Sequence, residues 1–333
     1  MYLRQGDTEL FNPRLLWKKD KKHHDGCVGL ECSPEGVAIC HVEYGDEGHI
    51  VTACAFLPQT NDVPQAEQIA RWLEQQGLTG LPCHYVLHPA EYELLLLDAP
   101  DVDESEVNDA VQWRVKDLIS RPMQDVVVQS FQLPSDAYRG RMKMIYVAVV
   151  ERSLIKNRLR LIREAGLRPH VIDITELALL NVARFLPEMS HQGVGLLRLR
   201  SSGGLMMLGH RGDMYFTRTV ETGLQGFGSE NGGLQLSTDA VVDNLSLEIQ
   251  RSLDYYETQL GKGMVNRMYV LPLKRPIDSL LDDLNRLLPL PIIELDANHH
   301  LPLESGLEIS KGDQAYCMAC LGAALRRIDA PAG

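Results

Sequence analysis

The sequence contains no long apolar run. No stretch reaches the roughly 18 consecutive apolar residues that a membrane-spanning helix requires. Residues 1–25 lack the apolar core of a secretory signal, and we interpret them as a leader to the folded chain. Leu15, Leu16 and Trp17 precede several lysines there, so a weak contact with a membrane surface or a partner stays open. We expect no direct membrane insertion.

Positive charge and aromatic residues are also scarce. The 333 residues include 33 Lys and Arg against 45 Asp and Glu, a formal net charge of −12, and only 6% are aromatic. An acidic chain has no bulk attraction for phosphate backbones, so we do not expect nucleic acid as a partner. The hydrophobic share of 44% is that of a globular protein, and the length suits about two domains.

Cysteine pairs and catalytic or metal-binding strings are missing as well. The seven cysteines are scattered and odd in number, which is typical of a reduced, cytoplasmic protein. Cys317 and Cys320 have CxxC spacing, but no second pair completes a zinc site, so we favour core packing over metal or redox chemistry. The histidine pairs 23–24 and 299–300 have no identifiable partner ligands, and no GxSxG, HExxH or GKT string occurs. We predict no catalytic residue and no metal site.

The order of the predicted elements divides the chain into two similar α/β halves. Alternating apolar residues and spaced turns predict strands within 26–57 and again within 193–220, each group followed by an amphipathic helix. A small α+β unit interrupts the first half. The predicted boundaries are 26–82 and 151–180 for the first half, 83–150 for the inserted unit and 181–330 for the second half.

The hairpin of residues 193–220 raises the question of a nucleotide. Its first turn contains Ser201, Ser202 and Gly203, small residues of the kind that cradle phosphate. Arg198 and Arg200, however, stand where such a loop would need a metal-holding acid and a small residue. An arginine can hold a phosphate but cannot hold Mg²⁺.

Four strings of the sequence carry a resemblance to a known family. They are VGLECSPEGVAICHVEY (28–44), LLLLDAPDVDESEVNDAVQWRVKDLISRPMQDVVV (94–128), EAGLRPHVIDITELALLNV (164–182) and LSLEIQRSLDYYETQ (245–259). With the order of elements, they resemble the actin-like superfamily and, within it, the PilM family of type IV pilus assembly proteins, nearest to its members from mannose-sensitive haemagglutinin (MSHA) pili. The resemblance implies an actin-like (ribonuclease H-like) fold of two α/β halves with a small inserted α+β subdomain.

The resemblance also implies where a nucleotide would lie, and the residues there depart from the family pattern. Glu31 and Ser33 occupy the Asp and Gly positions of the first phosphate loop, and Arg198 occupies the metal-side Asp position of the second. The place of the family's Gly-Gly adenosine motif reads Tyr269–Leu273, without glycine. We therefore expect no cofactor, with ATP and Mg²⁺ disfavoured, and no enzyme activity. Our hypothesis is that Arg198 and Arg200 face acids across the cleft and close it.

A partner site is predicted on the inserted unit. Residues 105–119 have an apolar helical stripe, and Trp113 lies nearly opposite it, between Gln112 and Arg114. Such a tryptophan is either buried against a neighbouring subdomain or is an anchor for a partner. The acidic residues of 98–106 are interpreted as a solvated loop and helix N-terminus.

The resemblance implies a cytoplasmic scaffold that is held at the inner membrane by its partners. It would bind the cytoplasmic tail of a PilN-like single-pass inner-membrane protein through Gln112, Trp113 and Arg114. Other pilus platform or motor proteins are further expected partners, and a homodimer is possible. The alternatives are an actin-like ATP-binding protein or ATPase of pilus or secretion machinery, and a polymerising cytoskeletal protein.

Overall fold

The computed structural model describes residues 26–45, 48–103, 106–138, 143–226, 238–274, 277 and 279–326. The expected leader, with Trp17 and the first histidine pair, lies outside the described residues. None of the helices in the described ranges is long and apolar enough to cross a membrane.

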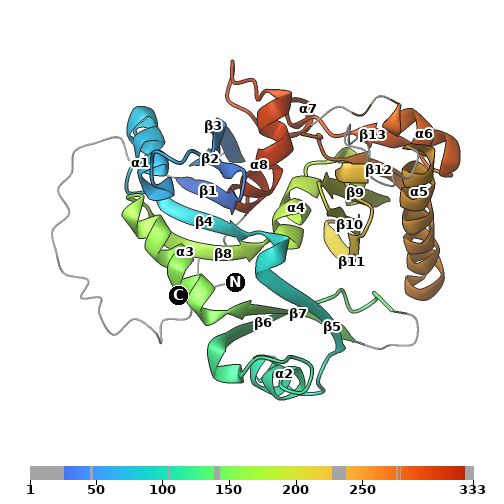
Figure 1. Cartoon of the computed structure of the whole chain (residues 1–333). Helices are drawn as coiled ribbons and strands as arrows, with labels where there is room; N and C mark the ends of the chain where they lie inside the picture. Colours follow the sequence, from blue (N-terminus) through green and yellow to red (C-terminus); the bar gives the residue numbers. More distant parts are fainter. Residues whose placement is uncertain are drawn as a thin grey trace.

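Two five-stranded sheets of the same topology form the two halves (Figure 1). In each sheet three antiparallel strands are followed by two strands parallel to the first. The first sheet has the order β3-β2-β1-β4-β8 and the second β11-β10-β9-β12-β13. The strands of the first sheet are β1 (Gly26–Ser33), β2 (Gly36–Gly45), β3 (Gly48–Pro58), β4 (Pro82–Leu87) and β8 (Arg168–Ile174). Those of the second are β9 (Gly193–Arg200), β10 (Gly203–His210), β11 (Asp213–Val220), β12 (Val265–Val270) and β13 (Ile292–Glu294).

Amphipathic helices cover the outer faces of the sheets. Helices α1 (Gln65–Gln76) and α3 (Arg152–Glu164) bury residues such as Ile69 and Ile162 against the first sheet. Helix α1 ends at Gly77, which adopts the left-handed conformation that glycine tolerates (φ 71°). The second half has α5 (Thr238–Tyr255), which continues as a π-helical turn, α6 (Leu280–Leu287) and the short α7 (Ala297–His300).

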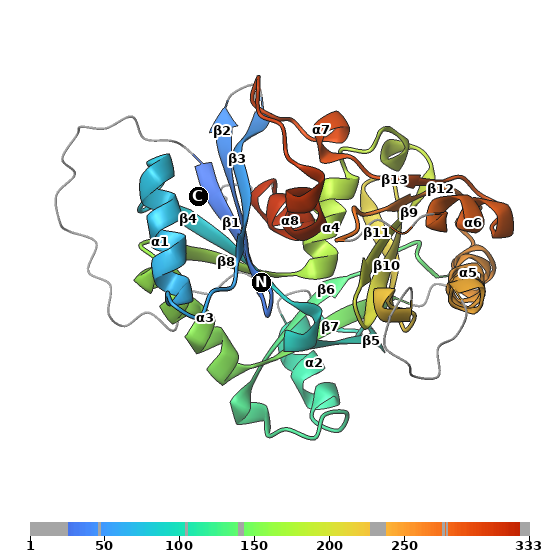
Figure 2. The ribbon, with the colours of Figure 1, turned by 45° about the horizontal axis from the view of Figure 1, so that its top comes forward.

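Two helices lie side by side between the sheets, α4 (Thr175–Ala183) and α8 (Lys311–Ala324) (Figure 2). Helix α8 closes the second half in sequence but packs against β1, β2, β3 and β4 of the first sheet. Gly322 allows the close approach, because a Cβ atom there would lie 1.9 Å from the carbonyl oxygen of Ala178. Cys317 and Cys320 are buried in the same core, as predicted.

The inserted unit is a three-stranded sheet with one helix. Its strands, in the order β5-β7-β6, are β5 (Tyr92–Asp98), β7 (Met144–Glu151) and β6 (Val126–Gln132). Helix α2 (Val107–Val115) covers one face with Val107, Val111 and Val115.

Two predicted limits of this unit differ from the structure. The boundary predicted at residue 83 falls inside β4, which belongs to the first sheet. An apolar strand that is buried along its length does not reveal from its sequence which sheet it joins. Helix α2 ends at Val115, before the predicted limit of residue 119, and Leu118 is exposed beyond its end.

The inserted unit also contacts the second half. The hydroxyl of Tyr146 accepts a hydrogen bond from the backbone N–H of Thr217 at 3.2 Å. Asp136 accepts a hydrogen bond from the Tyr215 hydroxyl at 3.0 Å and forms an ion pair with Lys262. These contacts join the inserted unit to β11 and to Lys262 of the second half.

Candidate functional site

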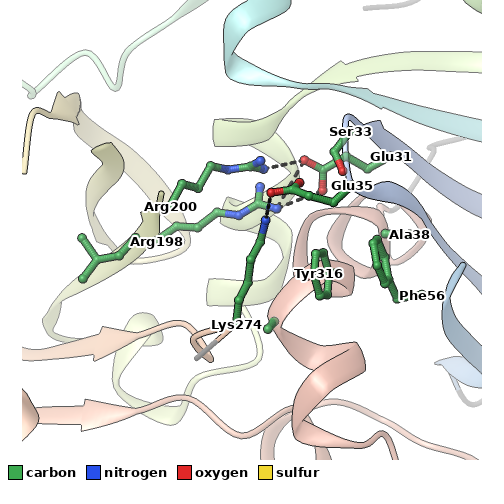
Figure 3. A pocket seen from close by; sticks show the side chains of 11 residues that line it. Glu31, Ser33, Glu35, Ala38, Phe56, Arg198, Arg200, Lys274 and Tyr316 are labelled. Carbon is green, nitrogen blue, oxygen red and sulfur yellow. Dashed lines mark hydrogen bonds and ion pairs between the residues drawn. The ribbon is translucent and has the colours of Figure 1, made fainter. Parts of the chain in front are cut away.

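The candidate site lies where the ends of β1 and β9 face each other across the cleft (Figure 3). Glu31 is near the end of β1, before the tight turn that leads into β2. Arg198 and Arg200 stand two residues apart at the end of β9, so their side chains lie on the same face of that strand. Both arginines extend toward Glu31 from the opposite half.

Glu31 receives two arginines at once. Nη2 of Arg198 lies 3.0 Å from Oε2 and 3.3 Å from Oε1, and Nη2 of Arg200 lies 2.7 Å from Oε1. Glu31 and Arg198 are 3% and 6% exposed, so this ion pair is scarcely screened by solvent. Burial alone would raise the pKa of Glu31, but the charges and hydrogen bonds of the two arginines outweigh it and lower the pKa to about 2.

A second ion pair bridges the cleft beside the first. Nζ of Lys274, in the segment after β12, lies 2.5 Å from Oε1 of Glu35, in the turn between β1 and β2. Burial opposes the charged form of Glu35, but its hydrogen bond with Lys274 and the charge of that lysine lower its pKa. The ammonium also lies 4.7 Å from the ring centroid of Tyr316, which stacks on Phe56 at 3.6 Å.

His88 completes the cluster from the end of β4. Its Nε2 lies 2.5 Å from Nη1 of Arg200, and since arginine can only donate, the imidazole accepts. Burial lowers the pKa of His88 to about 4, together with the charges of Arg200 and Arg198. The histidine is therefore neutral at physiological pH.

Little space remains between these side chains. The cavity enclosed by Glu31, Glu35, Arg198, Arg200, Lys274 and their neighbours measures about 10 Å³. That is about the room of one water molecule. Both oxygens of the Glu31 carboxylate accept hydrogen bonds from guanidinium groups of the opposite half. Among the described residues, no three His, Cys, Asp or Glu side chains are placed to hold a metal ion.

The structure brings together only part of the predicted site. Glu31, Ser33, Arg198 and Arg200 line one cavity. Ser201 and Ser202 instead line a separate hollow of about 680 Å³ between the hairpin and α5. Gly203 begins β10 with φ 145°, where a Cβ atom would lie 2.7 Å from the carbonyl oxygen of Val220. The backbone geometry at the start of β10 therefore requires a glycine at this position, whether or not a phosphate binds there.

The segment where the resemblance places an adenosine motif belongs to the core of the second half. Tyr269 and Leu271 are buried, and the Tyr269 hydroxyl donates a hydrogen bond to Glu188 at 2.9 Å.

Sequence reasoning missed Lys274 and His88. Lys274 directly follows the Tyr269–Leu273 segment, and His88 directly follows the buried β4. For His88, a polar residue at the end of a buried strand was the available signal, because such strand ends meet at the cleft. Lys274 follows the end of β12 at Val270 only after the segment 271–273, so it carried no such signal.

The three predicted partner residues form the outer face of α2. Gln112, Trp113 and Arg114 are all exposed, and Trp113 is 72% exposed. Within the described chain, the alternative that Trp113 is buried against a neighbouring subdomain is therefore wrong. Arg114 is partly engaged, since its Nη1 donates a hydrogen bond to the carbonyl oxygen of Asp98 at 2.6 Å.

Comparisons with known proteins place the fold. No protein-family model matches the chain, and no curated protein matches its sequence. Among solved structures, a chain of the PilM-PilN type IV pilus biogenesis complex is 19% identical with a TM-score of 0.71, covering 91% of this chain and 98% of that one. The cytoplasmic domain of EpsL, an inner-membrane component of the type II secretion system of Vibrio cholerae, is 14% identical with a TM-score of 0.47 (91% and 96% covered).

A Bacteroides thetaiotaomicron protein of unknown function with an actin-like ATPase fold is 8% identical with a TM-score of 0.48 (84% and 93% covered). The likeness to the chain of the PilM-PilN complex and the two sheets of one topology show the actin-like fold of two α/β halves that the resemblance implied.

Proposed function

We propose that this protein is a cytoplasmic scaffold of a type IV pilus assembly platform at the inner membrane. It binds the cytoplasmic tail of a PilN-like membrane protein and keeps its halves together without a nucleotide. Within the PilM family we assign it to the MSHA type, as a counterpart of MshI. The platform or motor proteins of that pilus are its further partners.

The observation that carries this proposal is the double engagement of Glu31 by Arg198 and Arg200. Where actin-like proteins that bind ATP need room for phosphates and an acid free for Mg²⁺, this chain has three cations and two carboxylates already paired across the cleft. A nucleotide would have to break buried ion pairs to enter. Two halves that are fixed by ion pairs across the cleft suit a protein that holds other proteins in place better than an enzyme that must open and close to turn over a substrate.

The exposed face of α2 supports the binding role. A tryptophan that is 72% exposed buries little of its large apolar surface in the isolated chain, and such residues dominate the energetics of interfaces. The similarity to a chain of the PilM-PilN complex directs the search toward the tail of a PilN-like protein.

The test is a binding titration with a fluorescent peptide that copies the cytoplasmic tail of the PilN-like protein from the same organism. We expect saturable binding and, for Trp113→Ala, a loss of about 2 kcal/mol, roughly thirtyfold in affinity. Met264→Ala removes an exposed apolar side chain from the second half and is the matched control, with unchanged affinity expected. A tail peptide that does not bind the full chain would contradict the proposal.

A second candidate function is ATP binding in an unusual manner. The hollow beside Ser201 and Ser202 is also lined by Arg218 and Arg251, which offer cations to a phosphate, although Glu221 and Glu248 in the same lining balance their charge. Calorimetric titration with Mg-ATP separates the two candidates.

A further inference from the structure

Strand β5 is an edge strand of the inserted sheet, and its backbone pattern shows which groups point outward. In an antiparallel pair, residues alternate between those bonded to the neighbouring strand and those whose N–H and C=O point away. The N–H of Ala99 donates to the carbonyl oxygen of Lys143 at 2.8 Å, and the β5–β7 register continues directly from that pair. Leu95 and Leu97 therefore bond to β7, whereas Leu94 and Leu96 point to the free edge.

The same alternation holds at other edges, where side chains cover the outward groups. On β6, Arg152 donates to the carbonyl oxygen of Val126, and Asn108 accepts from the N–H of Ser130. On β11, the hydroxyl of Tyr146 accepts from the N–H of Thr217. These residues limit pairing with another chain at those edges.

The free edge of β5 is covered only at its end. Arg114 donates to the carbonyl oxygen of Asp98, an outward position by the same alternation. Within the described part of the chain, no hydrogen bond reaches the outward backbone groups of Leu94 or Leu96. No residue of β5 is fully buried, and Leu96 is 36% exposed.

The C-terminal end of this edge and the segment after it are rich in acidic residues, whereas Glu93 at the other end is paired with Arg121. Asp98, Asp101 and Asp103 are exposed, and no described Lys, Arg or His lies within ion-pair distance of them. The whole chain has a net charge of −12. Segments that flank a membrane span on the cytoplasmic side are enriched in Lys and Arg, so their charge complements this edge.

We propose that the free edge of β5 takes an extended, basic tail segment of the membrane partner as an additional strand of the inserted sheet. This inference rests on the proposed function and deepens it by naming the mode of binding. Backbone hydrogen bonds with Leu94 and Leu96 fix the added strand. Its side chains alternate, so apolar residues lie beside the exposed Leu96 and Lys or Arg residues face the aspartates.

The variant Leu96→Pro tests this directly. Proline removes the outward N–H but no β5–β7 hydrogen bond, and edge positions tolerate it. We expect tail-peptide binding roughly tenfold weaker or worse, which corresponds to one to two lost backbone hydrogen bonds. Leu96→Ala keeps the N–H and is the matched control, with a smaller loss. Tail binding that is unchanged in a folded Leu96→Pro protein overturns the inference.

A second arm keeps the protein intact in case Leu96→Pro does not fold. Two tail peptides are N-methylated at alternate residues, one in each of the two frames. Only one frame faces β5 in an added strand, so we expect one peptide to lose binding and the other to keep it. Equal affinities for the two frames overturn the inference.

A synthetic peptide of alternating Lys and Leu separates this inference from the proposed function. If it binds in a Leu96→Pro-sensitive manner while the PilN-like tail does not bind, the edge stands and the proposed function fails. If the tail binds equally well to wild type and Leu96→Pro, the proposed function stands and the edge inference fails.

Discussion

At the residue scale, Glu31 connects the two halves, because two arginines of the opposite sheet share its carboxylate. Removing one member of a buried ion pair leaves charge without compensation, which destabilises a protein more than the pair itself stabilises it. The cleft residues therefore determine how firmly the halves stay together.

We predict that Arg198→Ala lowers the free energy of unfolding by about 3 kcal/mol, because Arg200 remains to neutralise Glu31 in part. Urea unfolding measures this, and small-angle X-ray scattering shows whether the halves separate. Arg286→Ala breaks an ion pair with Asp283 in which the arginine is 72% exposed, so it should change stability by less than about 0.5 kcal/mol. Unchanged stability and dimensions in Arg198→Ala would argue against ionic closure.

His88 gives a pH dependence with a definite sign. Its pKa falls from 6.5 in the unfolded chain to about 4 in the fold, because burial and the arginines disfavour the imidazolium. Above pH 6.5 both states are neutral and its contribution is complete. As the pH falls from 6.5 to 4, the unfolded chain takes up a proton and the folded protein does not, so stability decreases.

We expect His88→Gln to flatten the dependence of the unfolding free energy on pH between 6.5 and 4. Urea titrations at several pH values, with wild type in parallel, measure it. His84, whose pKa is also lowered to about 4, is present in both proteins, so the difference between them isolates His88. Parallel curves for the two proteins would contradict the assignment.

The sequence could predict the cleft residues in part. Arg198 and Arg200 stood out because their charge does not suit a phosphate loop with a metal, and the structure confirms that they face an acid across the cleft. Ser201 and Ser202 could not be separated from this cluster in advance. Which side of a turn a serine faces depends on how the hairpin packs against α5, and that is tertiary information.

At the scale of elements, the contact between α4 and α8 determines how the halves cross. Gly322 contacts Ala178 closely, and Asn181 of α4 donates a hydrogen bond to the carbonyl oxygen of Gly322 at 3.0 Å.

We predict that Gly322→Ala destabilises the protein by about 2 kcal/mol, because the new methyl group forces the two helices apart. Gly312→Ala is the matched control in the same helix. Its Cβ atom would have only the Ser310 hydroxyl nearby, at 3.7 Å, so we expect a neutral effect or a gain of up to about 1 kcal/mol. Thermal unfolding of both variants measures the difference in stability. Equal melting temperatures would contradict the prediction, because the contact between α4 and α8 would then accommodate the added methyl group.

Strands and helices with strong periodicity were predictable as elements. The strands within 26–57 and 193–220, and helices α1 and α3, lie where alternation and glycine stops placed them. Local periodicity could not predict to which sheet β4 belongs, nor that α8 packs against the first sheet. Both depend on contacts between residues far apart in the sequence, to which local periodicity is blind.

At the scale of the whole molecule, several contacts among the described residues join the halves. They include the ion pairs at Glu31 and Glu35, the helices α4 and α8, the contacts of the inserted unit with β11 and Lys262, and the backbone pairing of Val51 on β3 with residues 302–304. Our proposal is that these contacts keep the two halves closed without a nucleotide and that the exposed faces of the inserted unit bind partners.

Calorimetric titration of the purified full chain with Mg-ATP, and with ADP in parallel, tests this account most directly. The account predicts no heat of binding up to near-millimolar nucleotide, from a preparation whose cooperative unfolding shows that it is folded. Saturable heat in the micromolar range would contradict it, because nucleotide would then enter despite the ion pairs at Glu31.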